Sequence, residues 1–117
     1  AIYLVQNEVL PGAPSLTDDD VAYLRSIPVT FGAEEITEMA EIEAETRHDV
    51  KAVEYFLKRR LDAAAQVLGH ETALTGMHEI VHIFCTSEDI NNLSYALVIK
   101  GAIEEVWHPA ATALADQ

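Results

Sequence analysis

Apolar residues recur at intervals of three and four along most of the chain, and no stretch alternates steadily between apolar and polar positions. This spacing places apolar side chains on one face of an α-helix. The clearest helix is predicted from Asp49 to near Gly69, a typical C-terminal stop. Glu54 and Lys58, four residues apart, are expected on its polar side. The apolar stripe of this helix consists of Val50, Val53, Leu57, Leu61 and Ala64.

Turn-forming and acidic residues divide the region before this helix. Residues 1–10 are interpreted as the end of a helix, which the Pro-Gly-Ala-Pro turn at 11–14 stops. Thr17 and the three aspartates after it predict a short helix to about Ser26, and Pro28 is expected to prevent its extension. A further helix is predicted over 34–45, where an apolar stripe lies among six glutamates. These glutamates are expected to form a solvated face.

A short apolar segment, 74–84, leads into the last predicted helix, which continues from Thr86 toward the C-terminus. Pro109 is expected to kink this helix, because it lacks a backbone donor and clashes with a preceding carbonyl. Apolar residues occupy more than one side of the helix, which is typical of a helix that is buried all round. They are Leu93, Leu97, Val98, Ile99, Ile103, Val106 and Trp107. Taken together, the helices predict an all-α fold.

Two helix starts carry a capping-box-like pattern, a threonine followed three residues later by an aspartate. Thr86 as the N-cap leaves Ser87 and the first free backbone N–H groups facing outward, an arrangement that suits an anion. Thr46 as the N-cap of the earlier helix puts His48 and Asp49 at positions N2 and N3. For each pattern the ordinary alternative is a cap with no further role.

Composition limits the partners of the chain. Its 117 residues have a net charge of −13 with only seven Lys and Arg, so contacts with the phosphates of nucleic acids or with anionic membranes are not expected. The single cysteine, Cys85, excludes an internal disulfide and indicates a reducing compartment such as the cytoplasm. No apolar run approaches the roughly 18 residues of a membrane span.

Two segments resemble the first two signature regions of the adenylosuccinate lyase family, within the fumarase/aspartase superfamily. The first is Thr46–Lys58, with the sequence TRHDVKAVEYFLK, and the second is Cys85–Ser94, with the sequence CTSEDINNLS. The resemblance extends with few breaks from about Glu45 to about Trp107, which is about half of the chain. The first 44 residues match only loosely, through helical pattern.

The resemblance implies a cytoplasmic homotetramer of purine synthesis that eliminates fumarate from adenylosuccinate and from an earlier succinylated carboxamide ribotide. The partner of the site is then a small molecule, a succinylated purine nucleotide, and no cofactor or metal is implied. Where the family varies between Arg and Asn, this chain has Arg47. The residues that the resemblance assigns to substrate binding are Arg47, His48, Asp49, Thr86 and Ser87, with His82 in a supporting role.

The resemblance also implies that the catalytic acid and base lie elsewhere in the family's sequence. They belong to a Thr-His-Gly type segment and to a loop resembling Ser-Ser-x-Met-Pro-x-Lys-x-Asn, and neither segment occurs in these residues. The usual N-terminal Arg-Tyr phosphate-binding segment is missing too. We therefore expect a fragment that binds substrate and is inactive alone. It would comprise a partial N-terminal helical domain, 1–85, and the first long helix of a central helical bundle, 86–117.

Two alternatives stay open. The first is a zinc metallopeptidase, because His78-Glu79-Ile80-Val81-His82 is a literal H-E-x-x-H, which on a helix holds zinc between two imidazoles with the Glu as general base. Glu104 or Glu105 would be the third ligand. Only three of its five positions are fixed, so it arises often by chance, and the lyase resemblance accounts for His82 without metal. The second alternative is a non-catalytic helical interaction module, which would bind neither metal nor nucleotide.

Overall fold

The computed structural model describes residues 1–116, and within that range all regular structure is helical. The prediction of an all-α fold is confirmed. The chain divides into two compact units, Ala1–Ile83 and Phe84–Gln117, and each is described by itself.

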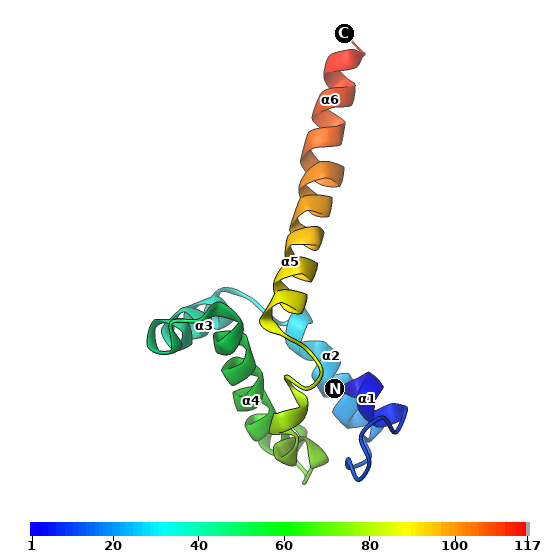
Figure 1. Cartoon of the computed structure of the whole chain (residues 1–117), viewed down its shortest axis with the longest axis vertical. Coiled ribbons are helices and arrows are strands. Elements are labelled where there is room, and N and C mark those ends of the chain that lie inside the picture. Colours follow the sequence, from blue (N-terminus) through cyan, green and yellow to red (C-terminus); the bar gives the residue numbers. More distant parts are fainter. Residues whose placement is uncertain (117) are drawn as a thin grey trace. The chain divides into compact units, whose positions relative to one another are not determined.

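The first unit contains four α-helices and two short 3₁₀ turns (Figure 1). Helix α4 is the longest, and α3 and α2 both pack against it. As predicted, α4 begins at Asp49 and ends before Gly69, whose φ of 75° closes the helix in the left-handed region. The elements of this unit are α1 (Ile2–Gln6), α2 (Asp18–Val29), α3 (Ala33–Thr46), α4 (Asp49–Leu68), η1 (Ala73–Gly76) and η2 (His78–Ile80).

Two predicted helix ends are wrong. Helix α1 ends at Gln6, ahead of the Pro-Gly turn, because the chain reverses at Glu8 with a φ of 51°. Helix α2 runs past Ser26 to Val29 and includes Pro28. In the last turn a proline removes only one backbone donor, and the N–H of Thr30 still closes the helix on the carbonyl of Ser26 at 2.9 Å.

Two clusters of buried side chains form the core of the first unit. One joins α1, α4 and the 3₁₀ turns, and the other joins α2, α3 and α4. Tyr23 and Leu24 of α2 pack against both clusters, and the Tyr23 hydroxyl donates to the carbonyl of Arg60 at 2.7 Å. The buried members are Val5, Leu61, Ala64, Leu74 and Met77 in the first cluster and Ile27, Ile42, Ala52 and Phe56 in the second.

The polar side of α4 is not where the sequence predicts it. Glu54 is only 6% exposed, whereas Val53 of the predicted apolar stripe is 37% exposed. The carboxylate tolerates burial because two ammonium groups of the same helix reach it, Lys51 Nζ at 2.8 Å and Lys58 Nζ at 2.9 Å. Placing Glu54 on the exposed side of the helix was therefore wrong.

The acidic helix α3 is only partly solvated. Glu38 pairs with two arginines of α4, since its Oε2 lies 2.7 Å from Arg60 Nη2 and its Oε1 lies 3.3 Å from Arg59 Nη1. Glu35 accepts the N–H of Gly32 at 2.9 Å and caps the helix start. The ion pairs of Glu38 tie α3 to α4, whereas the hydrogen bond between Glu35 and Gly32 stays at the start of α3. The prediction of a uniformly solvated acidic face is therefore wrong for Glu35 and Glu38.

In the second unit, the chain from Ser87 to Ala115 forms one continuous helix, drawn from yellow to red in Figure 1. It consists of α5 (Ser87–Gly101), a π-helical segment (Ala102–Trp107) and α6 (His108–Ala115). The backbone stays right-handed through the junctions at Gly101 and Trp107. The wider π turn ends at Trp107, two residues before Pro109, where the sequence predicts a kink.

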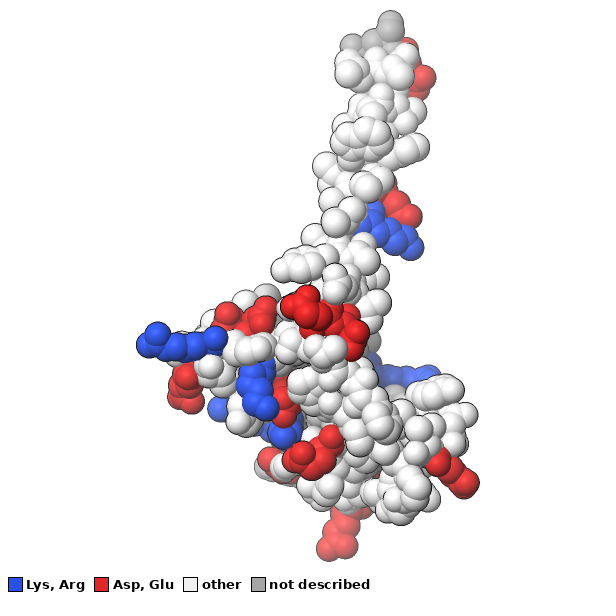
Figure 2. Space-filling model, in the orientation of Figure 1, with Lys and Arg blue, Asp and Glu red and all other residues white. Residues whose placement is uncertain are grey.

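Apolar side chains cover several sides of this helix and are exposed. Those more than half exposed include Leu93, Leu97, Val98, Ile99, Val106, Trp107 and Leu114. On the face shown in Figure 2, the helix carries few charged side chains along most of its length. No helix within residues 1–116 is both long enough and apolar enough to span a membrane.

The buried Glu54 predicts a dependence of stability on acid. The hydrogen bond from Lys51 is the largest cause that lowers the pKa of Glu54, to about 2, while burial opposes it and Lys58 adds to it. A carboxyl whose pKa is lower in the folded state stabilises the fold above its ordinary pKa near 4.5, and this contribution disappears as the pH falls toward 2.

We therefore expect wild type to be more stable than Glu54→Gln at pH 6, and the difference to shrink steadily between pH 4.5 and 2. Urea unfolding followed by circular dichroism measures it. Asp20 and Glu35 also have lowered pKa values, so the variant retains some acid sensitivity. Glu79→Gln, at a glutamate whose side chain is 94% exposed, is the control and should follow wild type. If the stability difference between wild type and Glu54→Gln stayed constant with pH, it would contradict a lowered pKa of Glu54 in the folded state.

Candidate functional site

The substrate-binding residues expected from the sequence fall into two groups. Arg47, His48 and Asp49 lie in the turn between α3 and α4 of the first unit, and Thr86 and Ser87 begin α5 in the second. Each group is described within its own unit.

The turn between α3 and α4 does not contain the predicted capping box. Thr46 is the last residue of α3, Arg47 takes the left-handed conformation with a φ of 52°, and His48 is the N-cap of α4. Asp49 is consequently the first helical residue rather than N3. The reversal needed to turn from α3 into α4 falls at Arg47, which moves the cap two residues downstream of Thr46. Placing His48 at N2 and Asp49 at N3 was wrong.

His48 acts as an unusual cap. Its Nδ1 accepts the N–H of Lys51 at 3.2 Å, so Nδ1 carries no proton and the neutral ring has its proton on Nε2. The Asp49 carboxylate lies 3.4 Å from the same Nδ1, and its Oδ1 accepts the N–H of Val50 at 2.7 Å. Because the His48 side chain is half exposed, its Nε2–H remains a donor for a ligand.

Arg47 is held in an uncommon backbone conformation. For a residue with a side chain, the left-handed region costs roughly 1–2 kcal/mol, and glycine is the usual occupant of such a helix end. Strain of this kind is frequent at functional sites. The arginine side chain is exposed and forms no ion pair with another residue of the 1–116 range.

A cavity of about 540 Å³ lies between the end of α3 and the middle of α4, next to this turn. Its lining carries both signs of charge, because Lys58 and Arg59 are positive and Glu45 and Asp62 are negative. Its lining consists of Ile42, Glu45, Thr46, Tyr55, Lys58, Arg59, Asp62 and His78.

The helix start at Thr86 agrees with its prediction. Thr86 is the N-cap of α5, its Oγ1 accepts the N–H of Glu88 at 3.3 Å, and its own N–H donates to Asp89 at 2.8 Å. Ser87 follows as the first helical residue and is half-buried. Its backbone N–H is one of the donors that a helix leaves unpaired at its N-terminus, where the helix dipole favours negative charge.

His82 contacts a residue that sequence reasoning did not connect with it. Its Nδ1 lies 3.1 Å from Oε2 of Glu54, the buried carboxylate of α4. The other ring nitrogen, Nε2, is buried and has no hydrogen-bond partner among residues 1–116. The spacing of Glu54 from Val50 and Leu61 was the available signal, because it puts the carboxylate on the apolar face of α4.

The H-E-x-x-H segment does not adopt the geometry of a zinc helix. His78 and Glu79 lie in a single 3₁₀ turn that ends at Ile80, so the two imidazoles do not share one face of an α-helix. His78 pairs with Asp62 at 2.7 Å, whereas His82 pairs with Glu54. Within residues 1–116, no three His, Cys, Asp or Glu side chains are grouped so as to hold a metal ion.

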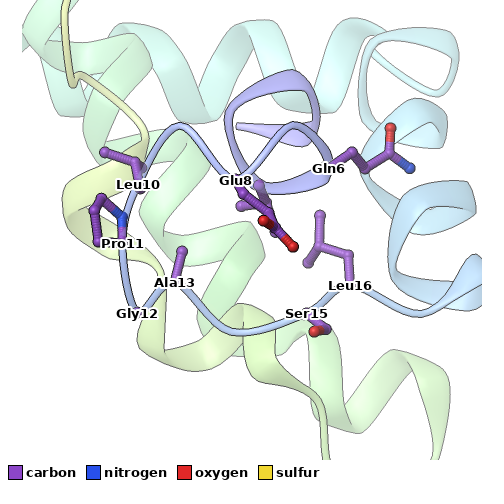
Figure 3. A pocket seen from close by; sticks show the side chains of 9 residues that line it. Gln6, Glu8, Leu10, Pro11, Gly12, Ala13, Ser15 and Leu16 are labelled. Carbon is purple, nitrogen blue, oxygen red and sulfur yellow. The ribbon is translucent and has the colours of Figure 1, made fainter.

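A second cavity, also of about 540 Å³, lies within the loop that joins α1 to α2 (Figure 3). Glu8 and Leu16 point into the space that the loop encloses. None of the predicted site residues contributes to it, and its lining is Val5, Gln6, Glu8, Leu10, Pro11, Gly12, Ala13, Ser15 and Leu16.

Comparison with known proteins gives consistent relatives. The chain is 44% identical over 90 residues to adenylosuccinate lyase of Buchnera aphidicola, covering 77% of this chain and 18% of the relative. It is 40% identical over 106 residues to adenylosuccinate lyases of Escherichia coli and Legionella pneumophila, covering 91% of this chain and 22% of each relative. No protein-family model matches.

The chain spans about a fifth of the length of these curated relatives. An alignment of 106 of the 117 residues necessarily contains both segments on which the resemblance rests, because at most 11 terminal residues lie outside it. At this identity over 77–91% of its own length, the chain corresponds to a segment of the adenylosuccinate lyases.

Proposed function

We propose that this chain is the part of an adenylosuccinate lyase that supplies substrate-binding residues. The whole enzyme would act in the cytoplasm, eliminating fumarate from adenylosuccinate to give AMP and from a succinylated aminoimidazole carboxamide ribotide. The observation that carries the proposal is the 40% identity to the Escherichia coli enzyme over 91% of this chain.

The proposed reaction is a β-elimination. A base removes the proton next to a substrate carboxylate, the electron pair left behind forms the double bond of fumarate, and the C–N bond breaks as an acid protonates the departing nitrogen. Negative charge accumulates on the carboxylate during this step, so positioned donors stabilise it. A substrate with two carboxylates and a phosphate therefore requires several donor sites.

The two groups of residues meet this requirement with donors of different kinds. Thr86 and Ser87 offer hydroxyls at the positive end of α5, and His48 offers an Nε2–H at the start of α4. Arg47 adds a fixed positive charge beside His48. The acid and base belong to family segments that are absent from these 117 residues, so we expect no turnover from the chain alone.

A chimera tests this proposal. The segment of the Escherichia coli enzyme that aligns with this chain is replaced by the chain, and cleavage of adenylosuccinate is followed by absorbance. We expect the chimera to release fumarate, whereas the isolated chain releases none above buffer. The control is a chimera carrying the aligned segment in scrambled order. A folded chimera without any turnover would contradict the proposal.

We also propose that residues 86–117 are the first long helix of a central domain, a helical bundle shared by subunits of a homotetramer, with residues 1–85 in the N-terminal domain. The support is the number of apolar side chains that α5 and α6 leave exposed. Each Leu- or Ile-sized side chain left in water forgoes roughly 1.5–3 kcal/mol of burial.

The chain alone is therefore expected to self-associate. Dimers or larger oligomers would cover the exposed apolar residues of α5 and α6. Sedimentation at micromolar concentration measures this, and Leu97→Glu combined with Val106→Glu is expected to shift the distribution toward monomer. A clean 12.9 kDa monomer of the unmodified chain would contradict the expectation.

A further inference from the structure

We propose that Glu54 is a positioning residue that fixes the orientation and the proton of His82, so that Nε2 of His82 is the ring atom presented to the substrate. The inference deepens the proposed function and rests on it for the identity of the substrate. The contact that suggests it joins residues 28 positions apart, with Nδ1 of His82 at 3.1 Å from Oε2 of Glu54.

The carboxylate of Glu54 is itself held in place. Lys51 Nζ contacts Oε2 at 2.8 Å and Lys58 Nζ contacts Oε1 at 2.9 Å, so both oxygens have a cationic partner. Only 7% of the Glu54 side chain is exposed. A buried carboxylate with two fixed partners has little freedom to rotate. It therefore also restricts the orientation of the imidazole ring that is hydrogen-bonded to it.

The direction of the hydrogen bond follows from the chemistry of the two groups. An ionised carboxylate can only accept, so Nδ1 of His82 must carry the proton and donate it. The lowered pKa of Glu54 keeps it ionised at neutral pH. In the neutral ring, Nε2 is then left with a lone pair, which accepts a hydrogen bond or a proton.

The unpaired Nε2 is what points to a ligand. Buried polar atoms are nearly always hydrogen-bonded, and leaving one unsatisfied costs about 1–3 kcal/mol. Nε2 of His82 is the buried side-chain nitrogen or oxygen within residues 1–116 that lacks a partner. An N–H or O–H of a bound substrate would satisfy it, and the amino nitrogen that carries the succinyl group and the ribose hydroxyls are donors of that class.

A structural ion-pair network is the alternative, in which Glu54 serves only Lys51 and Lys58. The two explanations differ in what they require of His82. Positioning requires one tautomer and one ring orientation, whereas a structural network leaves the ring free to hold its proton on either nitrogen. The charged groups that surround the pair are Lys51, Lys58 and Glu79, the last through its 3.6 Å contact with Lys58.

Nitrogen-15 NMR of the imidazoles in the 117-residue chain distinguishes the two. At a pH where the ring is neutral, we expect the His82 proton predominantly on Nδ1 in wild type. In Glu54→Gln the negative charge that favours a donating Nδ1 is lost, and one of the two oxygens becomes an NH₂ group, which requires Nδ1 to accept wherever it faces the ring. The Nε2–H form should therefore rise from a minor species to at least half of the population.

Glu79→Gln removes one negative charge near Lys58 without touching His82, and it should leave the tautomer unchanged. A wild-type ring with its proton mainly on Nε2 would overturn the inference, even if Glu54→Gln fails to fold. An unchanged tautomer in a folded Glu54→Gln would also overturn it.

The chimera adds a readout that separates this inference from the proposed function. Glu54→Gln is expected to lower kcat/KM by up to roughly a hundredfold through misplacement of His82, while Glu79→Gln keeps the activity of the parent chimera. If the His82 tautomer shifts in Glu54→Gln but the parent chimera and both variants are inactive, the proposed function fails, whereas the role of Glu54 in positioning His82 stands. If the chimera is active and Glu54→Gln leaves kcat/KM unchanged, the positioning role fails alone.

Discussion

Removing either hydroxyl at the start of α5 is expected to lower the kcat/KM of the active chimera by roughly ten- to a thousandfold, the range for one lost hydrogen bond to a charged ligand group. The variants are Thr86→Ala and Ser87→Ala, and His48→Ala should behave alike at the start of α4. The physical reason is that an anion held at a helix N-terminus depends on a few short, directed donors. Steady-state cleavage of adenylosuccinate measures each effect.

Thr86 also caps its helix, so its loss has a structural cost of about 0.5–2 kcal/mol that must be separated from binding. Ser87 is not a cap, and Ser87→Ala is the cleaner variant. Ser94→Ala, an exposed serine on the same helix, is the matched control and should keep parental kinetics. If Ser87→Ala and His48→Ala keep parental kinetics while Thr86→Ala loses only melting temperature, the two helix starts are caps and nothing more.

Phe56→Ala is expected to lower the free energy of unfolding of the first unit by about 3–5 kcal/mol, a large part of the stability of a small domain. Phe56 is 2% exposed and lies between α2, α3 and α4, where it packs edge-on against Phe31 at a centroid distance of 5.6 Å. Its removal leaves a cavity that helices tied by the ion pairs of Glu38 cannot fully close.

Urea denaturation followed by circular dichroism measures this loss. Val67→Ala is the control on the same helix, because Val67 is 65% exposed and should change the free energy of unfolding by less than about 0.5 kcal/mol. Equal effects of the two substitutions would show that α4 does not bury the face that the structure assigns to it.

Periodic spacing predicted the helices well because it is a local property of the chain. Asp49–Leu68 and the long helix from Ser87 follow directly from it, and the Thr86 cap follows from a threonine and an aspartate at the right distance. The predicted end of α2 before Pro28 is wrong, because the helix runs through this proline to Val29. A proline near the end of a helix or beside a π turn removes one donor and leaves the rest of the backbone pattern intact.

The site was harder to predict, since it depends on contacts between distant residues. The Thr46 pattern matched a capping box, yet the packing of α3 against α4 requires a reversal at Arg47 and gives the cap to His48. The sequence predicts Glu54 on the polar side of α4 as the partner of Lys58 four residues later, although its spacing also matches the apolar face. Only the approach of Lys51, Lys58 and His82 in three dimensions explains its burial.

A crystal structure of the chimera with AMP and fumarate bound tests directly whether this chain supplies substrate-binding residues. We expect ligand oxygens within hydrogen-bond distance of the Thr86 and Ser87 hydroxyls and of Nε2 of His48, with Arg47 beside an anionic group. A ligand bound in the active site with all four of these side chains outside its contact shell would contradict the claim that this chain supplies substrate-binding residues.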